Sequence, residues 1–257
     1  MAPLAFRSVL VLVLLFLYLP LAVMAVMAFN QSPLYALPMV FDTIWFEQLA
    51  QNERLIGAGL NSILIALANT VIATALGTMA ALAFQRYTFR GSSLLQILLL
   101  PPITIPWLII GTAMLVFFFW TGIGRGLHAI LLGHVALSLP YVIVVVGARL
   151  RSFGVSLEEA AATLGAGPWT TFRRVTLPVI APGVVAAALF AFAVSFDQFV
   201  ISYFLAPPGV STLPVEIYSA IRKGFTPEIN AISTVIILVS MGLMLAVARL
   251  YRFGGER

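Results

Sequence analysis

The side chains that could carry acid–base or metal chemistry are few and scattered along this chain. Its 257 residues include nine acidic residues, two histidines and no cysteine. Glu158 and Glu159 stand together in a basic stretch, whereas Asp197 stands alone within an apolar run. His128 and His134 have no companion ligand, so we expect structural roles for both and no metal site. Without a convergent set of nucleophile, base or metal ligands, and without thiols, the sequence disfavours an enzyme.

The composition is that of an integral membrane protein. Hydrophobic residues make up 61% of the chain and charged residues 9%, and the mean hydropathy is +1.08. Soluble domains carry about 25% charged residues. The net charge is +5, but the basic residues stand singly or in pairs at the ends of apolar runs. Such placement is typical of anchoring at a lipid bilayer, so we expect no nucleic-acid partner.

Six apolar runs are long enough to cross about 30 Å of hydrocarbon as helices. We therefore predict an all-α, polytopic membrane protein with six transmembrane helices and one transmembrane domain over residues 1–257, with its core at 59–252. The first run is longer than the core of a signal peptide, so we expect it to be retained. The runs are residues 9–28, 59–84, 94–120, 129–148, 183–205 and 229–248.

The basic residues predict the orientation of these spans. Six spans place both termini on one side of the bilayer. Ten of the Lys and Arg residues then fall on the side of the termini, and only Arg54, Arg125, Arg222 and Lys223 fall opposite. Because cytoplasmic loops carry the excess of positive charge, we expect cytoplasmic termini and a cytoplasmic loop at residues 150–182.

The second and third runs carry the features of closely packed helices. The second places small and polar residues near one helical face, which predicts a packing surface against other spans; these are Ala66, Asn69, Ala73, Gly77 and Ala81. The third run contains prolines at positions 101, 102 and 106. Proline removes a backbone donor, so we expect this span to kink or to start late.

The cytoplasmic loop carries the signals of two short helices. Ser156 and Glu159 have the spacing of a capping box, and Gly165 supplies a stop. Pro168 can open a second helix, and Pro182 with its neighbours should then bend the chain back into the membrane. The exposed, alanine-rich surface favours two interpretations equally: a docking patch for another protein, or a segment lying flat on the bilayer.

A resemblance to a known family decides between them. Glu159, Ala160 and Ala161 are followed after three residues by Gly165, and after nine more by "VTLP" at 175–178. This spacing resembles the EAA signature of inner-membrane permease subunits of bacterial ABC importers, with valine where the family has isoleucine. The resemblance implies a type I importer fold whose coupling helix, between spans four and five, seats in a cleft of an ATP-binding subunit.

The resemblance also implies roles for individual residues. Glu159 would make polar contact with the ATPase, Ala160 and Ala161 would allow close approach, and Gly165 would permit the turn. Glu158 and Ala166 flank these positions, and we assign them to the same ATPase-coupling surface. This chain has no Walker A stretch, so ATP and Mg²⁺ would be bound by the partner, and we expect no cofactor here.

Three further segments resemble the C-type permeases of spermidine and putrescine importers. They are "SFDQFVISYF" at 195–204, "TLPVEIYS" at 212–219 and "PEINAIST" at 227–234. A lone carboxylate within a span costs about 3 kcal/mol, so Asp197 should face a cavity or a partner. We expect Asp197, with Gln198 and Tyr203, to line the substrate pathway and attract a cationic amine. The alternative is a structural carboxylate held by hydrogen bonds or an arginine.

The function expected from these features is half of an ATP-driven import pathway in the bacterial inner membrane, for polyamines or a related small amine. The expected partners are a second permease in a heterodimer, two ATP-binding subunits and a periplasmic substrate-binding protein. One alternative is an importer permease for another small solute, such as an opine or an amino-acid-like compound. The other is a self-contained secondary transporter, which usually carries several intramembrane ionisable residues.

Overall fold

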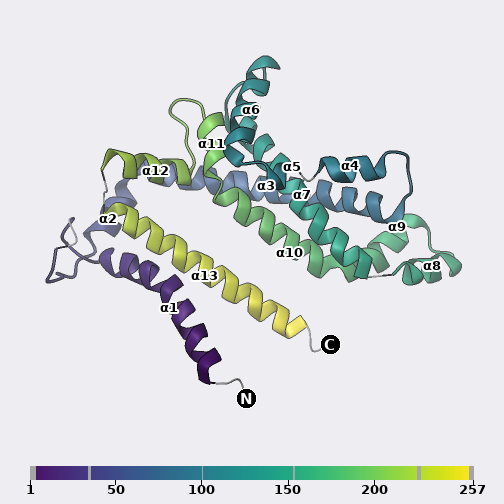
Figure 1. Ribbon diagram of the computed structural model, residues 1–257, viewed down its shortest axis with the longest axis horizontal. Coiled ribbons are helices and arrows are strands. Elements are labelled where there is room, and N and C mark those ends of the chain that lie inside the picture. Colours follow the sequence, from purple (N-terminus) through teal and green to yellow (C-terminus); the bar gives the residue numbers. More distant parts are fainter. Residues whose placement is uncertain (1–3, 34–35, 100, 153, 225–226, 255–257) are drawn as a thin grey trace. The chain divides into compact units, whose positions relative to one another are not determined.

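The computed structural model describes residues 4–33, 36–99, 101–152, 154–224 and 227–254, with side chains from Phe6 to Gly242. All regular elements in these ranges are helices, as predicted (Figure 1). The helices are α1 (Leu4–Met27), α2 (Ile44–Gln51), α3 (Glu53–Arg86), α4 (Ser92–Leu98), α5 (Pro101–Thr104), α6 (Trp107–Trp120), α7 (Leu127–Ser152), α8 (Ser156–Thr163), α9 (Pro168–Thr171), the π-helix η1 (Phe172–Thr176), α10 (Leu177–Phe196), α11 (Phe199–Leu205), α12 (Leu213–Lys223) and α13 (Glu228–Gly254).

Contacts within the chain define two compact units. Unit 1 comprises Met1–Ile56 and Ile217–Arg257, and unit 2 comprises Gly57–Glu216. Within unit 1, α13 packs against both α1 and α2. Asn52 Nδ2 donates to Glu228 Oε2 at 3.1 Å, which ties the residue after α2 to the first turn of α13. The single domain predicted over residues 1–257 stays a prediction.

Four helical segments in the described residues are long and apolar enough to cross a membrane. They are Phe6–Met27, Glu53–Arg86, Leu127–Ser152 and Pro168–Phe196. A bent pair, Ser92–Thr104 with Trp107–Trp120, makes a fifth if it counts as one span. In α13, the part whose side chains are described is the apolar stretch Glu228–Gly242, which is shorter than the four candidate spans. The predicted number of six spans therefore stays a prediction.

The third predicted span is broken where its prolines stand. The chain bends by 110° between the two parts of this span, α4–α5 and α6. Pro106 occupies the N-cap of α6 with an extended ψ of 131°, because proline fits a helix start but removes a donor from a helix interior. The expected kink is confirmed.

The core of unit 2 is formed by α3, α7 and α10, and α7 and α10 run side by side (Figure 1). All four of Ala66, Asn69, Ala73 and Ala81 on α3 are at most 1% exposed. At Gly77 a Cβ atom would lie only 2.5 Å from Val142 Cγ1 of α7. The small-residue face predicted from sequence is therefore the surface through which α3 approaches α7 closely.

A polar contact joins the same three helices. Asn69 Nδ2 donates to Ser138 Oγ of α7 and to the Ala191 carbonyl of α10, both at 3.0 Å. All three residues are fully buried.

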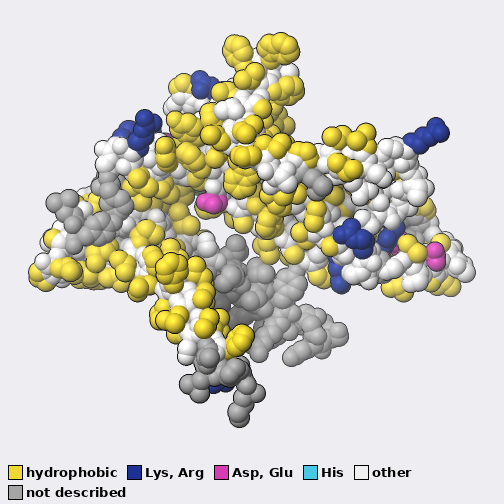
Figure 2. All heavy atoms as spheres, in the orientation of Figure 1, with side chains coloured by type: hydrophobic (Ala, Val, Ile, Leu, Met, Phe, Trp, Pro, Cys, Tyr) yellow, Lys and Arg dark blue, Asp and Glu magenta, His cyan; other side chains and the backbone are white. Residues whose placement is uncertain are grey.

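Large hydrophobic side chains are exposed along α1 and α6, and hydrophobic atoms dominate the visible face (Figure 2). Such a surface suits contact with lipid tails.

Candidate functional site

The loop that carries the EAA motif folds as a short helix with a tight C-terminal turn. Gly165 has φ +85°, which L-residues rarely adopt. Its N–H donates to the Ala162 carbonyl at 2.9 Å, and the Ala166 N–H donates to the Ala161 carbonyl at 3.0 Å. These two bonds form a Schellman motif. The predicted stop at Gly165 is therefore where α8 ends, and one of the two bonds of the turn joins Ala166 to Ala161.

The start of α8 differs from the sequence prediction. Ser156 is the first helical residue, and the N-cap position belongs to Val155. No side-chain hydrogen bond caps this helix among the described residues. The predicted capping box of Ser156 with Glu159 is therefore wrong. The Val155 carbonyl instead accepts the Glu159 N–H at 3.0 Å, because Val155 already has helical φ and ψ angles.

The two adjacent carboxylates of α8 have different partners. Glu158 accepts a bond from Arg86 Nε at 2.8 Å and one from Thr176 Oγ1 at 2.7 Å. It therefore fastens α8 to the last turn of α3 and to η1. Glu159 is exposed. Successive residues of a helix differ by about 100° in direction, so one carboxylate faces the protein and the other faces away.

The outward surface of this loop is apolar with a charged margin. Ala160 is exposed beside Glu159, and Ala161 is half-buried. Leu164 is 89% exposed and Trp169 is 70% exposed. Basic side chains gather over the end of unit 2 that carries α8 and α9 (Figure 2). We call this surface, Glu159, Ala160, Leu164 and Trp169, the loop face; exposed apolar groups of this kind mark interaction sites.

The helix that contains the predicted fifth span begins earlier than predicted. The predicted fifth span was 183–205, after a bend at Pro182 and its neighbours. The structure instead has helix from Pro168 through α9, η1 and α10 to Phe196, and this stretch counts as one candidate span. Pro168 opens it, as predicted. Pro182 lies inside α10 without ending it.

The same span ends earlier than predicted, at Asp197. Asp197 is the C-cap of α10, and Gln198 is the N-cap of α11. Gln198 Oε1 accepts the Val200 N–H at 3.1 Å, which is the hydrogen bond expected of an N-cap side chain. Asp197 therefore does not lie within a continuous helix but in the break between two helices.

The three predicted pathway residues have different environments. Asp197 is exposed, whereas Gln198 is only 2% exposed. Tyr203, on α11, is 45% exposed, and its ring lies 5.4 Å from that of Phe199. The break therefore brings Asp197 and Gln198 together but turns only the carboxylate outward. Their roles in the substrate pathway stay predictions.

Sequence reasoning missed a buried polar group beside this break. His134 of α7 is 2% exposed and lies between Ser195 of α10 and Ser202 of α11. Its ring nitrogens have serine partners, so its structural role is more specific than predicted. The available sequence signal was a pair of serines flanking Asp197 and Gln198, and no local rule links it to a histidine about sixty residues earlier.

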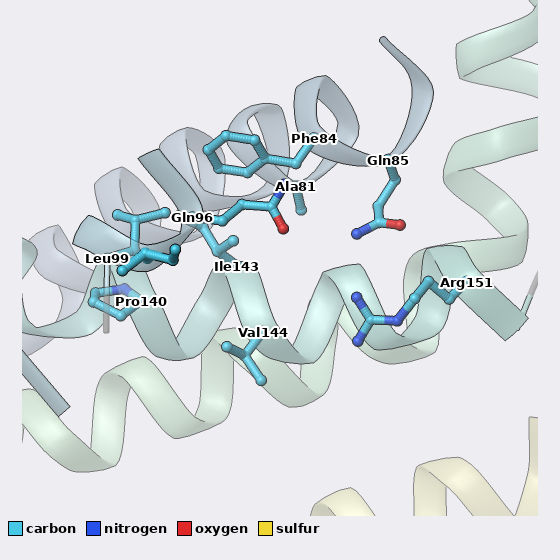
Figure 3. A pocket seen from close by; sticks show the side chains of 10 residues that line it. Ala81, Phe84, Gln85, Gln96, Leu99, Pro140, Ile143, Val144 and Arg151 are labelled. Atoms are coloured by element: carbon cyan, nitrogen blue, oxygen red, sulfur yellow. The ribbon is translucent and has the colours of Figure 1, made fainter. Parts of the chain in front are cut away.

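A separate cavity of about 230 Å³ lies between α3, α4 and α7 (Figure 3). Its walls are mostly apolar, and Gln85 and Arg151 point into the same space at one end (Figure 3). None of the predicted site residues lines it. We therefore place the candidate site at the loop face and at the helix break.

The comparisons with known proteins all point to membrane components of transport systems. Residues 73–255 match the family model described as "Binding-protein-dependent transport system inner membrane component". PotC, the spermidine/putrescine transport system permease protein of Escherichia coli K12, is 34% identical over 231 residues, covering 90% of this chain and 88% of PotC. PotI, the putrescine transport system permease protein of the same organism, is 36% identical over 230 residues, covering 86% of this chain and 82% of PotI.

A solved structure supports the fold. One chain of a bacterial ABC transporter involved in the import of the acidic polysaccharide alginate matches with a TM-score of 0.77 and 19% identity, covering 96% of this chain and 93% of that chain. The matched family comprises membrane permease subunits of ABC importers, whose ATPase is a separate subunit, so this chain is not itself an enzyme. The chain belongs to the family of inner-membrane components of binding-protein-dependent transport systems.

Proposed function

We propose that this chain forms half of the translocation pathway of an ATP-driven importer for polyamines or a related small amine. The cargo is carried over from PotC and PotI, whose names specify spermidine and putrescine. The observation that carries the proposal for this chain is the position of Asp197. It places an exposed carboxylate at the C-terminal end of a helix of 20 residues.

That position favours a cation on physical grounds. The C-terminus of a helix carries a partial negative charge of roughly half an electron. The N-terminus of α11 brings an opposite partial charge to the same break, so the Asp197 carboxylate sets the net negative charge that attracts an ammonium group. Broken helices expose such ends to solutes and ions in membrane transporters. In the proposed pathway, Asp197 attracts the amine while Tyr203, one turn along α11 from Phe199, offers an aromatic surface.

The loop face is the proposed contact with the ATPase. Glu159 and Ala160 are exposed on α8, and the Schellman turn at Gly165 holds Leu164 outward. Two ATP-binding subunits, a second permease and a periplasmic binding protein complete the proposed assembly. ATP and Mg²⁺ bind to the ATP-binding subunits. In this assembly, both termini and the loop at 150–182 face the cytoplasm, in agreement with the distribution of basic residues.

Transport in this assembly follows alternating access. Docking of the loaded binding protein and closure of the ATPase dimer open the pathway outward, and hydrolysis returns it inward. The loop face couples the two motions because α8 is joined to the membrane helices by the bonds of Glu158 to Arg86 and Thr176. Such coupling requires differential contacts in the two states, which the ATPase supplies.

The test is solute-dependent ATP hydrolysis and uptake by the whole complex in proteoliposomes. Binding protein loaded with spermidine or putrescine should stimulate both activities, and a neutral solute should not. Asp197→Asn should lower amine uptake roughly tenfold, while Asp197→Glu, which keeps the charge, should retain most of it. Equal stimulation by a neutral solute would contradict the proposed cargo. Full amine uptake by Asp197→Asn would contradict the proposed place of Asp197 in the pathway.

A further inference from the structure

One buried side chain from a third helix bridges the break between α10 and α11. His134 Nδ1 lies 2.8 Å from Ser195 Oγ, and His134 Nε2 lies 3.1 Å from Ser202 Oγ. Ser195 is in the last turn of α10, and Ser202 is in the first turn of α11. The two hydrogen bonds therefore span Asp197 and Gln198.

The hydrogen bonds of the two serines determine which ring nitrogen of His134 carries the proton. Ser202 Oγ donates its single proton to the Gln198 carbonyl at 2.8 Å. It can therefore only accept from His134, so Nε2 carries the ring proton. In the neutral ring Nδ1 then accepts the Ser195 hydroxyl proton. Both ring nitrogens are occupied by serine, which leaves neither of them for a solute or a metal ion.

The packing around α11 leaves little freedom besides these bonds. A Cβ atom at Gly133 of α7 would lie 2.6 Å from Ile201 Cγ2, and one at Gly111 of α6 would lie 2.8 Å from Phe204 Cδ2. The two glycines thus allow α11 to press against both helices. On the other side of the break, α10 packs along α7. Helix α7 therefore supports both halves, and His134 stands where they meet.

We infer that His134 is a positioning residue for transport: it fixes the angle between α10 and α11 and so holds the Asp197 carboxylate in the solute route. This inference rests on the proposed function, because it gives Asp197 a reason to be held. The imidazole acts through the two serines and does not touch the solute. Buried hydrogen bonds between membrane helices contribute modestly to stability, but here both ring nitrogens of His134 have partners, one on each side of the break, and so fix its geometry.

The first experiment measures the bridge without reference to cargo. In the assembled importer, His134→Leu should speed hydrogen–deuterium exchange of the amides at 199–205 about tenfold, since two hydrogen bonds are lost. Exchange in α8 should not change. His134→Gln should stay within about threefold of the unmodified protein, because its amide can still donate to Ser202. Unchanged exchange in His134→Leu would overturn the inference.

Two controls separate this effect from general damage. His128 lies on the same helix but is exposed and bonds the Ile123 carbonyl at 3.0 Å, so His128→Leu should not alter exchange at 199–205. If His134→Leu does not insert, Ser195→Ala removes one arm of the bridge with little change in volume, and it leaves the bond of Ser202 to the Gln198 carbonyl in place. It should raise exchange in the same segment, and unchanged exchange there would count against the bridge.

A double-mutant cycle links the bridge to transport. His134→Leu should lower amine uptake several-fold, and His134→Gln should restore most of it. In an Asp197→Asn background, His134→Leu should have little further effect, because the carboxylate it positions is gone. An equal loss in both backgrounds would show that His134 does not act through Asp197. Full uptake by Asp197→Asn alone would instead refute the proposed pathway role of Asp197, while the exchange result still decides whether the bridge exists.

Discussion

Replacing Gly77 by alanine tests the close approach of α3 and α7 directly. The added Cβ would lie 2.5 Å from Val142 Cγ1 and 2.7 Å from Val142 Cβ. Valine is branched at Cβ and has one strongly preferred rotamer in a helix, so its side chain cannot swing away. The helices themselves must separate, and we expect Gly77→Ala to destabilise the protein.

The magnitude follows from the geometry. Ordinary contacts of a Cβ begin at 3.4 Å, so the 2.5 Å contact requires a separation of about 0.9 Å, the difference of the two values. Overpacking of this kind costs about 1–3 kcal/mol. Alanine also gains about 0.8–1 kcal/mol of helix propensity over glycine. Gly59 on the same helix is the matched control, because no described atom lies within 4 Å of its added Cβ.

The assay is the thermal unfolding midpoint of the purified complex, followed by tryptophan fluorescence. Gly59→Ala should leave the midpoint unchanged or raise it slightly. Gly77→Ala should fall below Gly59→Ala by the overpacking cost, at roughly 2–4 °C for each kcal/mol in a chain of this size. Equal midpoints for the two variants would refute the close approach of α3 and α7.

Three further substitutions probe the loop and the core. Gly165→Ala should strain the turn by about 1–2 kcal/mol and lower solute-dependent ATP hydrolysis without loss of insertion, whereas Gly167→Ala, in the same loop with a φ of −69°, should not; equal activities would count against the turn. Glu158→Gln should lower the unfolding midpoint by the equivalent of about 1 kcal/mol, and the double variant with Arg86→Gln should lose less than the sum of the two single losses, since the two side chains are paired; fully additive losses would contradict this. Asn69→Ala should cost about 1–2 kcal/mol in the same assay, and an unchanged midpoint would refute the role of its two buried bonds.

The packing of the core could be predicted from the sequence because it depends on local periodicity. Small residues spaced along one face of a helix can only serve close approach, and Ala66, Ala73 and Gly77 do lie against other helices. The break at Pro106 could also be predicted, since proline has the same effect on its own backbone in any context. Features that depend on a residue's own spacing or chemistry were therefore accessible.

The break at Asp197 could not be predicted in this way. The residues around it are apolar on both sides, and neither Asp197 nor Gln198 is a strong helix breaker like proline or glycine. Gln198 caps α11 locally, but the other stabilising contacts come from His134 and from the glycines that seat α11, all distant in sequence. Tertiary contacts decided the local structure, so hydropathy alone predicted a continuous span.

In the EAA loop, one feature could be predicted from a residue's own chemistry and others depended on contacts with the rest of the fold. Gly165 ends α8 as predicted, because only its own φ is involved. The capping box failed because Val155 adopts helical angles, which moves the helix start one residue earlier and takes Ser156 out of the cap position. The sequence placed Glu158 and Glu159 together on one rim. It could not show that Arg86, at the end of α3, would bind Glu158 and leave Glu159 exposed.

This division of the two carboxylates gives the loop a mechanical property that the motif alone does not suggest. A docking helix transmits movement only if it is joined to the membrane helices more firmly than a flexible linker would join it. Glu158 provides that joint by binding Arg86 of α3 and Thr176 just before α10, while Glu159 remains exposed for a partner. Since Asp197 stands at the other end of α10, a displacement of α8 in the proposed assembly would reach the helix break through one continuous helix. Trp169 of the loop face and Asp197 of the proposed amine site thus stand at opposite ends of the helix Pro168–Phe196, and Glu158 joins α8 to that helix through Thr176.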